Sequence, residues 1–145
     1  MVLPRFVRQA LAGDDLTVYG NGMQSRCFAH VLDVVQAIVL LLDHERTAGR
    51  VFNIGASTET AIVELARRVI ERTGSLSKIR LVPYEEAYED GFEELGRRKP
   101  DTAAVRELTG WIPTRTVDDA IDDVIAFEQG ARSGQQRAIG LHIAG

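Results

Sequence analysis

Apolar residues recur at helical spacing along the chain and predict several helices. The first spans residues 4–11, where a proline suits the first turn and Gly13 suits a stop. A second begins at Asp33, a residue type that caps helices, and its apolar residues cover most of its circumference. We therefore expect this second helix to be buried on more than one side. A third helix spans residues 60–74, with its apolar residues on one face.

The last third of the chain predicts two further helices. Asp101 can cap a short helix that Gly110 ends, and residues 117–129 form the last helix. Residues 131–145 lose the periodic pattern, so we expect a frayed tail there. Residues 1–130 then form the folded domain.

β-Branched and alternating residues predict the strands. Residues 16–20 and 24–31 flank an Asn-Gly turn, which predicts a hairpin. Residues 50–55 and 78–84 flank the third helix, an order typical of a right-handed βαβ unit with a parallel strand pair. Residues 85–100 have weak periodicity and predict a surface segment with at most short helices. The expected fold class is a small mixed α/β domain.

The composition is that of an ordinary globular protein and disfavours some classes of partner. The chain has 145 residues, of which 45% are apolar and 26% charged. Its formal net charge of -4 provides no overall positive field for nucleic acid or an anionic membrane. The single cysteine cannot form an intramolecular disulfide, and no stretch resembles a secretory signal or a membrane-spanning helix. We therefore expect a cytoplasmic protein.

The residues alone do not define a self-contained active site. The glycines of residues 20–25 are not followed by a helix pattern, so they do not form a dinucleotide-binding loop. His30, His44 and His142 lack metal-ligand spacing, and the serines lie outside any nucleophile motif. Arg26 differs from these residues because it lies in an apolar stretch, where a guanidinium needs a carboxylate or phosphate partner.

Four segments, in order, resemble the carboxyl-terminal part of the extended short-chain dehydrogenases that act on nucleotide sugars, the NAD-dependent epimerase/dehydratase family. The segments are VLPRFVRQAL, LTVYGNGMQSRCFAHVLDVVQAIVLLL, GRVFNIGASTETAIVELARRV and RRKPDTAAVRELTGW. They cover nearly the whole chain from Val2 to Phe127, and the pattern is most similar to UDP-glucuronate decarboxylases and UDP-glucose 4-epimerases. The resemblance implies that residues 1–130 are the nucleotide-sugar-binding domain of such an enzyme.

In that family, a Rossmann half holds NAD with a Gly-rich turn and supplies a catalytic Tyr-x-x-x-Lys pair. This sequence has neither motif, since Tyr19, Tyr84 and Tyr88 have no lysine four residues downstream. The resemblance therefore implies a truncated chain without catalytic or cofactor-binding residues, inactive alone, with NAD and the Rossmann half supplied elsewhere. No metal site is expected.

The resemblance also implies which residues hold the diphosphate of a UDP- or dTDP-linked sugar. Arg26 would contact the diphosphate. Arg98 and Asp101, spaced R-x-x-D, would contact the diphosphate and the ribose or base. The alternative interpretation of the basic run at residues 97–99 is a solvated surface.

Other positions would complete the pocket. By resemblance, Tyr19 and Gln24 would line it beside the nucleotide, and Phe6 would pack there or belong to the core. Because the family packs this part on the Rossmann sheet, the chain alone should leave an apolar face uncovered and self-associate. The alternative function is a non-catalytic interaction or regulatory module that kept the scaffold but lost nucleotide binding.

Overall fold

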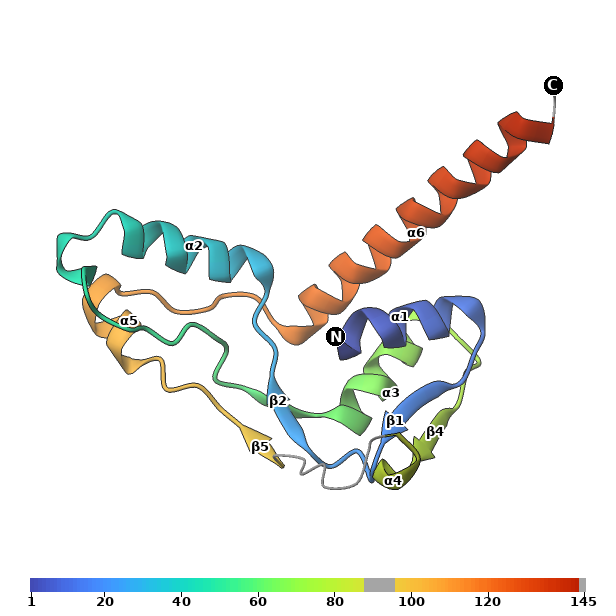
Figure 1. Ribbon diagram of the computed structural model, residues 1–145, viewed down its shortest axis with the longest axis horizontal. Helices are drawn as coiled ribbons and strands as arrows, with labels where there is room; N and C mark the ends of the chain where they lie inside the picture. Colours follow the sequence, from blue (N-terminus) through green and yellow to red (C-terminus); the bar gives the residue numbers. More distant parts are fainter. Residues whose placement is uncertain (88–95, 144–145) are drawn as a thin grey trace.

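The structure, a computed structural model, describes the backbone of residues 1–87 and 96–143 and the side chains of residues 1–86 and 96–131. The described chain folds into helices and short strands (Figure 1). The helices are α1 (Val2–Ala12), α2 (Val31–Leu42), η1 (Glu45–Thr47, a 3-10 helix), α3 (Ile62–Thr73), α4 (Tyr84–Ala87), α5 (Ala103–Thr109) and α6 (Val117–Ile143). The strands are β1 (Leu16–Tyr19), β2 (Ser25–Cys27), β3 (Glu59–Ala61), β4 (Ile79–Val82) and β5 (Arg97–Arg98). The mixed α/β class is confirmed.

Two small sheets replace the predicted hairpin. β1 pairs with β4 in parallel, while β2 lies in the second sheet, antiparallel to β3 and parallel to β5. The predicted pairing of β1 with β2 is therefore wrong. The turn between them instead lies against the start of α3, where Gly22 O accepts from Val63 N at 2.9 Å and Gln24 O accepts from Ile62 N at 3.1 Å. α3 has no side-chain cap, so these carbonyls satisfy N–H groups that its first turn leaves free.

This turn depends on glycine. Gly22 has a φ of 72°, and an added Cβ would lie 2.8 Å from both Val18 Cγ1 and Val63 Cβ. Gly20 also has positive φ, and an added Cβ there would collide with the ring of Tyr84. The turn therefore needs the left-handed conformation and the small size of glycine.

The predicted βαβ unit is partly correct. α3 and β4 form as expected and β4 has a parallel partner, but that partner is β1. The segment from Arg50 to Gly55 has a strand-like sequence, yet it pairs with no strand among the described residues. An extended segment becomes part of a sheet only where a neighbour accepts its backbone hydrogen bonds.

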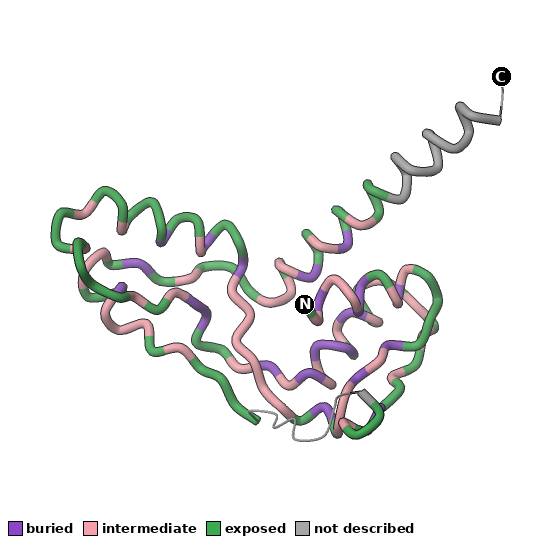
Figure 2. The backbone as a smooth tube through the Cα atoms, in the orientation of Figure 1, coloured by how far each residue is buried: buried purple, intermediate pink, exposed green. Residues whose placement is uncertain are grey.

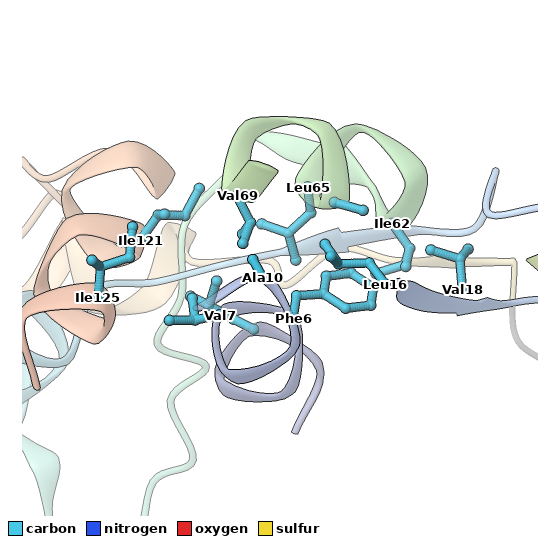
Figure 3. Packing of buried hydrophobic residues seen from close by; sticks show 12 residues of the cluster. Phe6, Val7, Ala10, Leu16, Val18, Ile62, Leu65, Val69, Ile121 and Ile125 are labelled. Atoms are coloured by element: carbon cyan, nitrogen blue, oxygen red, sulfur yellow. The ribbon is translucent and has the colours of Figure 1, made fainter. Parts of the chain in front are cut away.

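The larger core lies between α1, β1, α3 and α6 (Figure 3). Phe6 and Val7 of α1 are fully buried there, as are Leu65 of α3 and Ile121 of α6. Gly13 ends α1 in the left-handed conformation, as the sequence predicts. The helical periodicity therefore identified this core correctly.

A smaller core joins α2 to α5 through Ala37, Val105 and Trp111. The predicted capping role of Asp33 is wrong, because the cap of α2 is His30, whose Nδ1 accepts from Leu32 N at 3.2 Å. Asp33 lies in the first turn, fully buried, with its carboxylate turned towards residues 114 and 115.

α2 is far more exposed than predicted (Figure 2). Its buried residues are Asp33 and Ala37, whereas Val31, Val39 and Leu42 are 65%, 58% and 81% exposed. The expectation of burial on more than one side is therefore wrong for this chain. No other described element covers the outer face of α2, so its apolar residues meet solvent.

The remaining helices follow the predictions more closely. Gly110 ends α5 in the left-handed conformation, as predicted. The N-cap of α5 is Thr102 and not the predicted Asp101, although Asp101 Oδ1 does accept from Ala103 N at 2.9 Å. α6 continues to Ile143, beyond the predicted end at Gln129. Fraying of residues 131–145 stays a prediction, and residues 88–95 of the predicted surface segment lie outside the described chain.

Candidate functional site

The register of the second sheet brings two of the predicted site residues together. β2 and β5 lie side by side (Figure 1) and run in parallel. Their register places Arg26 directly opposite Arg98. Neighbouring strands lie about 4.8 Å apart, and side chains of directly paired residues leave a sheet on the same face. The side chains of Arg26 and Arg98 therefore leave the sheet on the same face, although 71 residues separate them in sequence.

A cavity of about 450 Å³ lies where α1, β1 and β2 meet. Of the predicted site residues, Tyr19, Gln24 and Arg26 line it, whereas Arg98 does not. Arg5 and Arg8 of α1 line it too, and none of the described lining residues is acidic. Three guanidinium groups, those of Arg5, Arg8 and Arg26, therefore line one cavity. This cavity is locally positive although the net charge of the chain is -4.

Arg5 is a residue that the sequence reasoning missed. Its Nη2 donates to Thr17 O at 3.0 Å, and its guanidinium carbon lies 4.7 Å from the centre of the Tyr19 ring. The buried Nε–H has no hydrogen-bond partner, and no carboxylate among the described residues forms an ion pair with Arg5. Its charge is therefore uncompensated by the described chain. An arginine between Pro4 and Phe6, on a helix that packs on the core, was the available signal.

The other cationic groups around the cavity have protein partners. Arg8 lies 3.8 Å from a carboxylate oxygen of Glu128, and Arg26 Nη1 donates to Ser25 O at 2.7 Å. Gln24 Nε2 donates to Tyr19 O at 3.1 Å, which closes the turn between β1 and β2. Phe6 is fully buried and does not line the cavity, so of its two alternatives the structure places it in the core.

Asp101 lies elsewhere. It lines a second, more open cavity of about 590 Å³, together with Arg97 and Lys99. Neither Arg26 nor Arg98 is among the residues that line this cavity. The side chain of Asp101 accepts from Ala103 N at the start of α5, and its backbone carbonyl accepts from Asn53 Nδ2 at 3.2 Å. The R-x-x-D spacing therefore does not bring Arg98 and Asp101 into one cavity.

Arg97 points to the opposite face of the sheet from Arg98. Its Nε and Nη2 each donate to the carboxylate of Glu59 on β3 at 2.7 Å, and Ser25 Oγ donates to the same carboxylate at 3.0 Å. The hydrogen bonds from Arg97 lower the pKa of Glu59 to about 2. Burial, and secondarily the charge of Glu59, raise the pKa of the nearby Cys27 thiol, which favours its protonated, unreactive form.

Among the described residues, no group of three or more His, Cys, Asp or Glu side chains is placed to hold a metal ion. None of the described helices is long and apolar enough to cross a membrane. The groups that the cavity presents are the guanidinium groups of Arg5, Arg8 and Arg26 and the ring of Tyr19. Such groups can bind an anion that carries a planar ring.

Fold and cavity together define a mixed α/β domain with an arginine-lined opening. A family model described as the NAD dependent epimerase/dehydratase family matches residues 1–55. The UDP-N-acetyl-alpha-D-glucosaminuronate decarboxylase of Bacillus cytotoxicus is 43% identical over 126 residues, which are 87% of this chain and 39% of that protein. The UDP-glucuronic acid decarboxylase 1 of Xenopus tropicalis is 34% identical over 87% of this chain and 28% of its own length.

Solved structures agree on the fold. An epimerase from Methanothermobacter thermautotrophicus superposes with a TM-score of 0.84 and 18% identity, over 94% of this chain and 39% of that one. The UDP-glucose 4-epimerase of Thermotoga maritima, solved with UDP-glucose, gives 0.79 and 23% over 90% and 40%. The chain belongs to the NAD-dependent epimerase/dehydratase family of extended short-chain dehydrogenases, and it spans about two fifths or less of the length of these relatives.

Proposed function

We propose that this chain binds the nucleotide and diphosphate of a nucleotide sugar, as the substrate-binding part of an NAD-dependent epimerase, dehydratase or decarboxylase. The observation that carries the proposal is the cavity that Arg5 and Arg26 line, together with the strand register that pairs Arg26 with Arg98 on β5. A diphosphate concentrates negative charge on oxygens that planar guanidinium groups bind bidentately. Each desolvated contact contributes about 1.5–3 kcal/mol.

The names of the relatives favour a UDP-linked sugar. The decarboxylases from Bacillus cytotoxicus and Xenopus tropicalis are named for UDP-sugar acids, and a UDP-glucose 4-epimerase shares the fold. The ring of Tyr19, at the cavity wall, is suited to contact a nucleobase, and Gln24 lies beside it. A dTDP-linked sugar has the same diphosphate and remains the alternative.

NAD and the catalytic pair would come from a Rossmann half. The exposed face of α2 and the unpaired segment from Arg50 to Gly55 are the surfaces that such a half would cover. Covering them would bury apolar side chains and pair a strand-like backbone, both of which favour association. We therefore expect the chain to bind ligand weakly, to self-associate through this face, and to show no turnover when NAD is added.

Equilibrium dialysis with UDP and UDP-glucuronate tests the proposal. Arg26→Ala or Arg98→Ala should weaken binding by about 10- to 100-fold, the equivalent of one lost charged contact. Arg46→Ala is the matched control, because Arg46 is exposed on η1, outside both cavities and outside the sheet that pairs Arg26 with Arg98. Unchanged UDP binding in both the Arg26 and the Arg98 variant would reject the clamp.

The exposed apolar face of α2 favours one second candidate, an interaction module that no longer binds nucleotides. A thermal-shift experiment separates the two functions. A ligand at 100 times its dissociation constant adds about 2.7 kcal/mol to stability. The interaction module would be favoured if the chain folds alone and its melting temperature does not change at any UDP concentration.

A further inference from the structure

β5 is a short strand at the edge of the second sheet, where it carries Arg98 next to Arg26. It comprises Arg97 and Arg98, both exposed, and among the described strands it pairs with β2 alone. Two paired residues contribute few backbone hydrogen bonds. Beside them, Ser25 N donates to Gly96 O at 2.9 Å. Backbone pairing alone is therefore a weak constraint on where β5 lies.

A side-chain contact supplies a second constraint. The guanidinium of Arg97 reaches across β2 to β3 and forms two hydrogen bonds of 2.7 Å with the carboxylate of Glu59. Ser25, on the central strand, donates to the same carboxylate. All three strands of the sheet are thus linked on one face, in the order β3, β2, β5.

The opposite face carries Arg26 and Arg98. Because side chains alternate along a strand, Arg97 and Arg98 must point to different faces of the sheet. The charge of Arg97 is matched by Glu59, whereas the register places Arg98 beside Arg26. Two neighbouring arginines in one basic run therefore have different environments.

We infer that Glu59 and Arg97 are positioning residues for the diphosphate clamp: their two-bond contact holds β5 in the register that places Arg98 beside Arg26. This inference rests on the proposed function. An exposed ion pair ordinarily contributes little, but a bidentate one fixes direction as well as distance. The ion pair acts on the register of the two-residue strand itself, whereas the hydrogen bond from Asn53 Nδ2 to Asp101 O holds the chain only three residues further on.

Titration of the full chain with UDP and with inorganic pyrophosphate tests the inference. Glu59→Gln and Arg97→Met should each weaken the binding of both ligands by about five- to tenfold, since Arg98 then samples positions away from Arg26. Arg97→Lys keeps the charge but loses the two-bond geometry, so it should also weaken binding. The charge exchange E59R/R97E rebuilds the contact and should bind within about threefold of the unaltered chain. Circular dichroism and Trp111 fluorescence establish that each variant is folded.

The outcomes separate this inference from the proposed function. If Arg98→Ala loses UDP while Glu59→Gln and Arg97→Met bind normally, the clamp stands and the positioning role is overturned. A loss in the single variants that the exchange does not reverse, in folded protein, also overturns it, because the charge at each position would then matter more than the contact. If the unaltered chain binds neither ligand, the proposed function fails and the inference fails with it.

Discussion

Replacing Asp33 should destabilise the junction between α2 and the chain that leads into α6. Its fully buried carboxylate accepts four hydrogen bonds, all from Thr114 and Arg115. Two come from backbone N–H groups, at 3.0 and 2.8 Å, and the Arg115 guanidinium donates another at 2.8 Å. The backbone carbonyl of Asp33 also accepts from Trp111 Nε1 at 3.0 Å. One residue therefore fixes the loop on both sides of Pro113.

The cost follows from what each substitution leaves behind. Asp33→Ala leaves two backbone N–H donors without their acceptor and removes a contact with the Arg115 guanidinium, which is 40% exposed and can be hydrated, so we expect a cost of about 3 kcal/mol. Asp33→Asn can still accept from the backbone donors but loses the charged contact, for a cost of about 1.5–3 kcal/mol. Asp43→Asn, at the exposed end of the same helix, should change stability by less than about 0.5 kcal/mol.

Urea unfolding followed by the fluorescence of Trp111 measures this order, because that buried indole packs in the same small core. The pH dependence gives a second check. Burial would raise the pKa of Asp33, but the hydrogen bonds from Arg115 and Thr114 outweigh it and hold the pKa below its ordinary value. The stabilisation should therefore be complete above about pH 4 and be lost as the pH falls through the lowered pKa. A cost below about 1 kcal/mol for Asp33→Ala, or a cost for Asp33→Asn that grows on acidification, would refute the reasoning.

Two further substitutions distinguish core residues from site residues. Phe6→Ala should cost about 3–5 kcal/mol in urea unfolding because the ring is fully buried in the larger core; a large loss of UDP binding at unchanged stability would instead place Phe6 in the site. Arg5→Met should weaken UDP binding by about tenfold and change the urea midpoint little, since removal of a buried N–H that has no acceptor offsets the lost hydrogen bond to Thr17 O. A lower midpoint with unchanged binding would show that Arg5 serves the fold alone.

The sequence predicted best where structure is local. α1 and α5 end at glycines in the left-handed conformation, and the apolar spacing of α1 and α3 identified the larger core. Strand pairing was less predictable because it depends on distant segments. The Asn-Gly turn suggests a hairpin, yet its carbonyls are used to satisfy the uncapped first turn of α3. No local pattern could reveal that competition.

The candidate site shows the same division. Arg26 was identifiable because a guanidinium in an apolar stretch needs a partner. Its register with Arg98 was not, because a two-residue strand carries no periodic signal. Arg5 was overlooked because one arginine on an amphipathic helix resembles an ordinary solvated residue. The structure places Asp101 in a cavity with Arg97 and not with Arg98. Arg97 and Arg98 point to different faces because they lie in a strand, β5, that the sequence did not predict.

The two local failures, at α2 and at residues 50–55, belong to one region of the molecule. Phe52 and Ile54 pack against the small core that α2 and α5 form, so the unpaired strand-like segment lies next to the helix whose apolar residues meet solvent. A sequence pattern records the surroundings in which a segment is stable, and agreement between local pattern and structure is the rule in foldable proteins. The larger core obeys that rule and the small core does not. A partner that supplied both a neighbouring strand and an apolar surface would restore agreement at both places at once, which is why we assign the proposed Rossmann contact to this region and not to the cavity side of the domain.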